Sequence, residues 1–249
     1  MKLKNNYSYI YHIFKQSLNT QKFLLVFIFS IILSAYGVIQ IAWETDYVTG
    51  FLRILTNPYY IAIIILILMM NLSNIFTIFE NNQFYIIRFN SKKKYLIELI
   101  KNICFSNLCI IILNLALVTI GLNIFNPNEI GESFKGYEIS NNIYLLFTII
   151  KFIMIMILIT IISVLFLKLF NNKVMAIFNV LLSISMIIVS SYHYMVTSII
   201  QLPIFIGTYL RYQLYSSFIF EVSCFLLYSS LLYIIIIVLN KITLKYMKE

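Results

Sequence analysis

Charged residues are scarce in this sequence of 249 residues. Asp, Glu, Lys and Arg together make up 11% of it, whereas hydrophobic residues make up 61%. In a typical soluble domain about a quarter of the residues are charged. The scarcity excludes an ordinary soluble domain and predicts an all-α integral membrane protein with a single membrane domain, residues 1–249.

The side chains of common metal and disulfide sites are also few. The three cysteines, Cys104, Cys109 and Cys224, lie inside apolar runs without a CxxC pair, so no disulfide framework or zinc site is predicted. The only histidines are His12 and His193, and an HExxH motif is absent. We therefore expect no metal and no catalytic site, although a membrane enzyme stays as a third, weaker hypothesis.

A phosphate-binding loop is missing as well. The one GxxxxG spacing runs from Gly131 to Gly136 and is followed by Tyr137 and Glu138. The lysine that would contact the β- and γ-phosphates is therefore absent. We expect no cofactor on this chain, and any ATP would be bound by a separate subunit.

Long apolar runs fill most of the sequence. A transmembrane helix needs roughly 20 apolar residues. Hydropathy predicts six such helices: Phe23 to Trp43, Tyr59 to Ile78, Ile103 to Phe125, Ile143 to Leu169, Val174 to Tyr194, and Phe218 to Leu239.

Positive charge alternates between the segments that join these runs. Alternate segments, both termini included, hold fourteen Lys and Arg residues, and the intervening segments hold three. By the positive-inside rule both termini are predicted to be cytoplasmic. The net charge of +9 is thus explained by topology and gives no reason to expect a nucleic-acid partner.

Two apolar segments are too short to cross a bilayer. In residues 1–22, Tyr7, Ile10, Phe14 and Leu18 recur with helical spacing, which predicts an interfacial helix, with a frayed tail as the alternative. Residues 195–210 are interrupted by Pro and Gly and are either re-entrant or an extension of the fifth span. Trp43, Tyr47, Tyr59 and Tyr60 are placed at the outer ends of the first two spans, at headgroup level.

The segment 80–102 is longer and more basic than topology requires. Phe84, Ile87 and Arg88 precede the polar pair Asn90 and Ser91, and residues 92–101 then continue helically into the third span. This order indicates a short helix, a turn and a helix that enters the membrane. Apolar anchors beside charges are typical of a docking surface for a cytoplasmic partner.

Together these features resemble the permease subunit of a type-2 ABC exporter. The resemblance covers the whole chain as architecture and charge pattern. It implies that Glu80, Phe84, Ile87 and Arg88 form a coupling region for a separate ABC ATP-binding subunit, and that a second permease copy or homologue faces this one. Asn81 and the residue after it depart from the family pattern, in which a small residue is frequent.

Two charges remain inside apolar sequence. Lys151 lies 17 residues before Lys168 and Glu221 lies 20 residues before Lys241, which places them at ~25 and ~30 Å above the inner surface at ~1.5 Å per residue. Their similar depth and opposite charge predict an intramembrane pair. The alternative is that each side chain reaches the outer headgroups separately.

The resemblance predicts a transport subunit, not an enzyme, in the cell membrane. It would export or clear an amphipathic peptide, such as a bacteriocin, or a hydrophobic compound. The alternative is a stand-alone membrane binding or immunity protein without a motor. The abundance of Ile, Asn and Lys is typical of AT-rich genomes, such as those of low-GC Gram-positive bacteria.

Overall fold

The computed structural model describes residues 13, 15–41, 47–81, 91–125, 140–170 and 218–246, and every regular element in these ranges is a helix. The helices are α2 (Gln21–Ile41), α3 (Tyr47–Thr56), α4 (Pro58–Asn81), α6 (Lys92–Phe125), α7 (Asn141–Phe170) and α10 (Phe218–Tyr246). Five of them, all but α3, are long and apolar enough to cross a membrane. The predicted span 174–194 and the segment 195–210 lie outside the described residues.

Three helix starts are fixed by side chains that the sequence supplies in the right place. The Oγ1 atom of Thr20 accepts the backbone N–H of Phe23, and Oδ1 of Asn57 accepts that of Tyr59 at 2.9 Å. The Oγ atom of Ser91 accepts the N–H of Lys94 at 3.2 Å. Such caps satisfy N–H groups that have no partner within the helix. α6 therefore begins at its lysines, as the sequence predicts.

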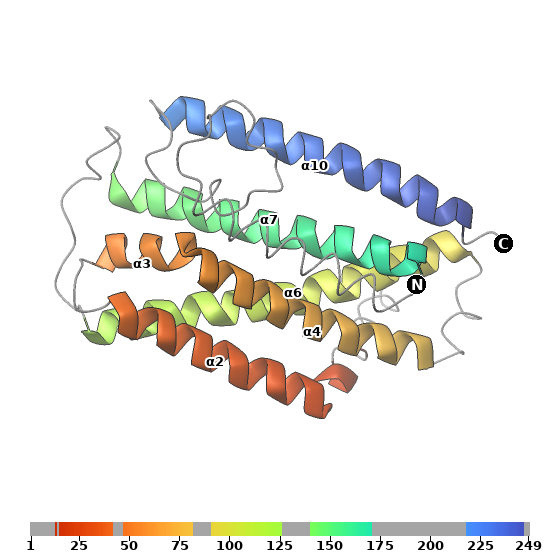
Figure 1. Ribbon diagram of the computed structural model, residues 1–249, viewed down its shortest axis with the longest axis horizontal. Helices are drawn as coiled ribbons and strands as arrows, with labels where there is room; N and C mark the ends of the chain where they lie inside the picture. The colour runs from red at the N-terminus through yellow and green to blue at the C-terminus, as the bar shows by residue number, and fades with distance from the viewer. Residues whose placement is uncertain are drawn as a thin grey trace, which may run out of the picture.

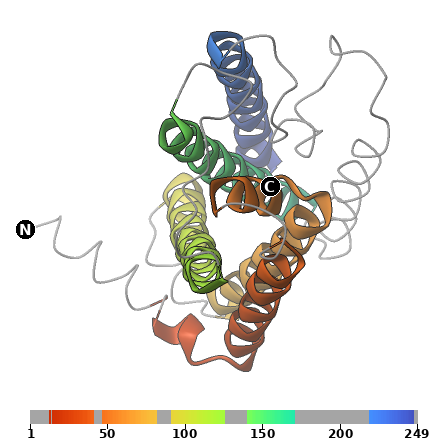
Figure 2. The same ribbon diagram turned by 90° about the vertical axis from the view of Figure 1, so that its left-hand side faces the viewer.

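The long helices run along a common direction as a bundle (Figure 1). α2 packs on α4 and α6, α6 packs on α7, and α10 packs chiefly on α7 at the side of the bundle (Figure 2). α2 and α6 begin at the end of the bundle where α4, α7 and α10 finish. Because Lys22, Lys93, Lys94, Lys168 and Lys245 all lie toward that end, we call it the lysine end.

The opposite end holds a helix that hydropathy did not predict. α3 occupies part of the segment expected to be an outer loop, and it contacts α2, α4, α6 and α7. Val48, Phe51, Leu52 and Leu55 are all buried, and their offsets of 0, 3, 4 and 7 form one helical face. The helix closes this end of the bundle, which we call the α3 end (Figure 2).

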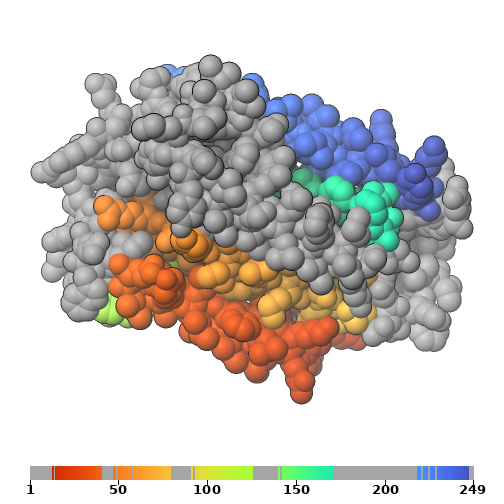
Figure 3. Space-filling view, in the orientation of Figure 1, coloured from red at the N-terminus to blue at the C-terminus, as the bar shows by residue number. Residues whose placement is uncertain are grey.

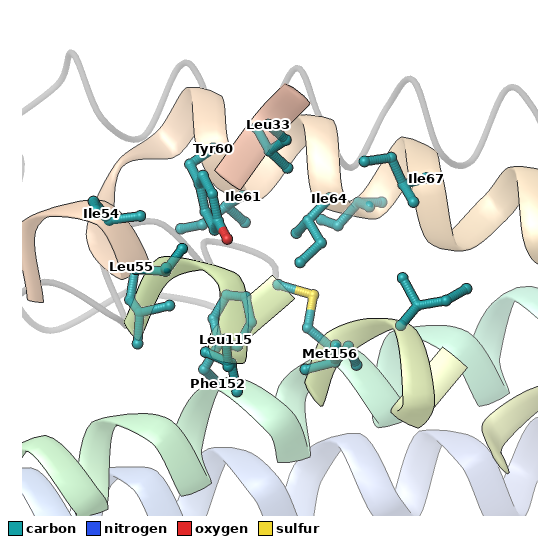
Figure 4. Close-up of a cluster of buried hydrophobic side chains, with 14 of the residues drawn as sticks. Leu33, Ile54, Leu55, Tyr60, Ile61, Ile64, Ile67, Leu115, Phe152 and Met156 are labelled. Carbon is teal, nitrogen blue, oxygen red and sulfur yellow. The ribbon is translucent and has the colours of Figure 1, made fainter. Parts of the chain in front are cut away.

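The main core lies between α4 and its neighbours. Figure 4 shows Tyr60, Ile61 and Ile64 of α4 directed toward Phe152 and Met156 of α7, and all five are buried. Tyr60, which the sequence placed at headgroup level, packs its ring inside the bundle. Tyr59, by contrast, is 49% exposed.

A glycine lets α2 approach α6 closely. A Cβ atom at Gly121 would lie 2.8 Å from Cγ2 of Val38 on α2, closer than packed carbon atoms tolerate. Small residues at such contacts allow tight packing, which matters in a membrane because lipid tails remove the hydrophobic drive between helices.

The outward faces of α2 and α10 are apolar and exposed. On α2, Leu24 and Ile39 are 60% and 59% exposed, and on α10 Leu226 and Ile234 are 60% and 55% exposed. The uncovered length of α10 is visible at the upper right of Figure 3. Single exposed apolar residues are ordinary in any protein, but two whole apolar faces suit contact with lipid.

Candidate functional site

The two charges inside the predicted spans lie together at the interface of α7 and α10. Nζ of Lys151 is 2.6 Å from Oε1 of Glu221, and the two side chains are 1% and 2% exposed. A second ion pair, Lys101 with Glu98, lies at the surface of α6, where the lysine is 53% exposed. An exposed pair contributes little to stability, whereas the loss of one partner from a buried pair is costly.

On α7, Tyr144, Phe147 and Lys151 follow one another at offsets of 0, 3 and 7, which places them on one helical face. The hydroxyl of Tyr144 donates toward the Glu221 carboxylate, 3.3 Å from Oε2 and 3.4 Å from Oε1. The Lys151 ammonium lies 5.2 Å from the centre of the Phe147 ring. The lysine is thus held by a carboxylate and by an aromatic face together.

On α10, Phe218, Glu221 and Phe225 repeat the same offsets of 0, 3 and 7. The Phe218 and Phe225 rings meet the Phe147 ring edge-on, with ring centres 5.2 and 5.8 Å apart. Phe218 also contacts Tyr144, at 6.4 Å. We call these six residues of α7 and α10 the ion-pair cluster: Tyr144, Phe147, Lys151, Phe218, Glu221 and Phe225.

α3 covers one side of this cluster. Val48 and Leu52 form a small apolar group with Tyr144, and Leu52 is fully buried. Water is thereby kept from the tyrosine that contacts the carboxylate, and a lower local dielectric strengthens the attraction between the two charges. The unexpected helix thus becomes part of the site's surroundings.

The chemistry available to the cluster is recognition of charge. One carboxylate, one ammonium group and three phenylalanine rings offer contacts for a charged group in an apolar setting. In the ranges that the structure describes, no group of three or more His, Cys, Asp and Glu residues could hold a metal ion.

The predicted coupling residues are only partly described. Glu80 lies in the last turn of α4, whereas Phe84, Ile87 and Arg88 lie outside the described residues. Residues 92–101 were predicted to continue helically into the third span, and they are the first turns of α6.

A second cluster joins the end of α4 and the start of α6 to α7. Nζ of Lys168, near the end of α7, lies 4.5 Å from the Phe76 ring centre and 5.2 Å from that of Tyr95. Phe79 meets Tyr95 edge-on at 6.0 Å. Ile13, from the predicted interfacial segment, packs into the same buried group. The end of α4 and the start of α6 are therefore tied to α7.

Buried amides inside the bundle went unnoticed in the sequence. Asn71 of α4 donates from Nδ2 to Ser106 Oγ and to Asn107 Oδ1, both at 2.8 Å. Asn107 of α6 donates in turn to Thr160 Oγ1 of α7 at 3.1 Å. All four side chains are at most 1% exposed. The chain of bonds joins three transmembrane helices.

Two further bonds extend this pattern to α2. Ser34 of α2 donates to Asn114 Oδ1 of α6 at 3.1 Å. At the lysine end, Asn74 of α4 donates to Oγ1 of Thr20, the residue that caps α2. The signal in the sequence was the presence of isolated Asn residues in otherwise apolar spans, since each such side chain needs a partner there.

Comparisons with protein-family models, with curated proteins and with solved structures find no match. Function must therefore be inferred from the residues themselves.

Proposed function

We propose that this chain is the membrane-spanning subunit of an ATP-driven exporter of the ABC type, with ATP hydrolysed by a separate subunit. The observation that carries the proposal is the basic, helical extension at the start of α6. This helix has 34 residues, or about 51 Å at 1.5 Å per residue, whereas the hydrocarbon core is only about 30 Å thick. We place the excess at its first turns, because Lys93 and Lys94 there are charged and exposed.

The extension is suited to transmit a contact from a partner. Lys93 and Lys94 are exposed, while Tyr95 and Leu99 of the same turns are buried against the bundle. The charged side of α6 faces outward and its apolar side packs against the bundle. A force on the segment between α4 and α6 would therefore be transmitted to the helices. Clustered charges also steer a partner of opposite charge toward such a surface.

The lysine end is proposed to face the cytoplasm of a bacterial cell, with six spans and both termini inside. The support is the excess of Lys and Arg in the segments at that end, fourteen against three, and the gathering of the described lysines there. This arrangement puts the segment between α4 and α6 within reach of a cytoplasmic ATPase. A second permease copy or homologue would complete the transporter.

The ion-pair cluster is proposed to be the part of the substrate path that this chain contributes. Charged residues within a membrane face a protein interior or a pathway, because exposure to lipid is costly. The cargo we propose is an amphipathic peptide or a hydrophobic compound, in keeping with the apolar faces beside the cluster.

The first test is whether the neighbouring reading frame encodes a protein with GxxxxGK[ST], and the second is whether that protein co-purifies with this chain. The variant Phe84→Asp with Ile87→Asp should lose that protein while inserting into the membrane at the wild-type level, because two charges replace the apolar anchors. The matched control is Phe125→Asp at the other end of α6, which should retain it. Equal retention by all three forms would contradict the docking assignment, and a wild-type chain that purifies alone would favour a stand-alone membrane protein.

A further inference from the structure

The Lys151 ammonium occupies a site that has the components of a general ammonium receptor. Glu221 supplies the counter-charge at 2.6 Å, and the Phe147 ring lies beneath the cation at 5.2 Å. Phe218 and Phe225 hold that ring in place from α10. A carboxylate combined with aromatic faces is the arrangement by which proteins bind ammonium and quaternary ammonium groups.

The receptor and its present occupant lie only partly on the same helix, because Phe147 shares α7 with Lys151. The carboxylate and two of the rings belong to α10, whereas the cation is the end of a flexible four-carbon side chain on α7. Departure of the ammonium group would leave Glu221 and the rings on their helices. Lys151 is then equivalent to a tethered ligand, and another ammonium group could replace it.

The ion-pair cluster lies just beneath an exposed apolar surface that is suited to contact with lipid. Phe147 and Phe218 are half-buried, and their neighbours Leu146, Ile150 and Ile219 are 60%, 51% and 78% exposed. A molecule dissolved in the bilayer could therefore reach the rings laterally, with its apolar tail against these residues. Such a molecule must be an amphiphile, because only its head would enter the site.

After displacement, the Lys151 ammonium group can reach the headgroup region. Lys151 lies 17 residues from Lys168 along α7, or ~25 Å, so it is within ~5 Å of the far face of a ~30 Å hydrocarbon layer. A lysine side chain spans that distance and can place its charge among headgroups. Exchange of one ammonium group for another then leaves no charge stranded in the hydrocarbon.

We propose that Glu221 and the Phe147 ring, which Phe218 and Phe225 hold in place, bind the ammonium group of a cationic amphiphile that enters from the bilayer and displaces Lys151. Binding of the amphiphile does not require an ATPase. Only the further step, that the bound amphiphile is cargo, rests on the proposed transport function. Lys151 competes with any ligand for the site and so lowers the affinity of the site for other ammonium groups. Anionic amphiphiles should not bind there, because Glu221 would repel them.

The experiment uses the full chain in nanodiscs of phosphatidylglycerol, a lipid without an amine. Dodecyltrimethylammonium is titrated, and dodecyl sulfate, which has the same tail and the opposite charge, is the control ligand. Lys151→Met should bind the ammonium probe at least 10-fold more tightly than the wild type, because the internal competitor is gone. Glu221→Gln should bind it at least 10-fold more weakly than the wild type, and the double variant should match Glu221→Gln.

A second arm separates the two sources of an ammonium group. Phosphatidylethanolamine in the nanodisc should weaken probe binding if the site takes a lipid headgroup, and should leave it unchanged if the site takes a free amphiphile. Lys151→Gln replaces Lys151→Met if the latter does not fold, and the wild type against Glu221→Gln remains informative alone. Equal affinities across the variants, or equal binding of the two probes, would overturn the proposal. No ATPase is present, so that result would leave the transport proposal standing.

Discussion

Removing one charge of the buried pair should destabilise the protein more than removing both. Lys151→Met and Glu221→Gln each keep the approximate volume of the side chain and each leave the other residue charged at a site that is 1% to 2% exposed. The double variant leaves no charge behind. The prediction is therefore that the two single changes are not additive, because they remove the same interaction and create opposite stranded charges.

The magnitude follows from the burial of the pair. Breaking a buried ion pair by removing one partner costs about 3–5 kcal/mol, and replacing both with uncharged side chains is often close to neutral. The site lies near one face of the hydrocarbon, where a lone lysine can still reach headgroups, so the lower figure applies to Glu221→Gln. The Glu221 side chain is shorter than that of lysine and reaches the headgroups less easily. Lys151→Met, which leaves Glu221 alone, should therefore lower the free energy of unfolding at least as much as Glu221→Gln. The Tyr144 bond, at 3.3 Å, is long and adds little.

The assay is reversible unfolding in bicelles, followed in parallel by thermal melts of the purified protein. About 3 kcal/mol corresponds to a fall in Tm of about 6–12 °C for a chain of this size, and the double variant should fall by no more than about 4 °C. The coupling free energy from the double-mutant cycle should be at least about 2 kcal/mol. A coupling indistinguishable from zero would mean that each side chain is solvated alone, and the pair would then have no energetic meaning.

Three further outcomes are expected. Gly121→Ala should destabilise the chain by about 1–3 kcal/mol in the same unfolding assay, because the new methyl group meets Val38 at 2.8 Å; stability equal to the wild type would show that α2 shifts freely. Asn107→Ala should cost about 1–2 kcal/mol, since it removes the bonds to α4 and α7, whereas the exposed Asn123→Ala should cost nothing measurable. In a background free of native cysteines, a cysteine at Lys93 should resist an impermeant thiol reagent added outside intact cells; labelling there would overturn the proposed orientation.

The long helices were predictable because each depends on local composition. The caps Thr20, Asn57 and Ser91 mark three starts, and uninterrupted apolar runs set the lengths. α3 was missed because it is only ten residues long and Arg53 lies within it, so a hydropathy window takes it for a loop. The apolar face that includes Phe51 was nevertheless present in the spacing of its residues.

The site was predictable only in part, for a related reason. Lys151 and Glu221 could be matched by counting residues from the basic segments, since depth in a bilayer follows from rise per residue. The aromatic partners depend on the rotation of α7 against α10, which no single helix encodes. The same limit hid the bonds of Asn107, whose partners lie on two other helices.

The proposed function depends most on the pairing of this chain with a separate ATPase. The most direct measurement is the rate of ATP hydrolysis by the neighbouring GxxxxGK[ST] protein in liposomes that contain this chain and in liposomes that do not. We expect several-fold stimulation by the wild-type chain, and none by the Phe84→Asp, Ile87→Asp variant present at equal amount. A hydrolysis rate that is the same with and without the wild-type chain would contradict the proposed function.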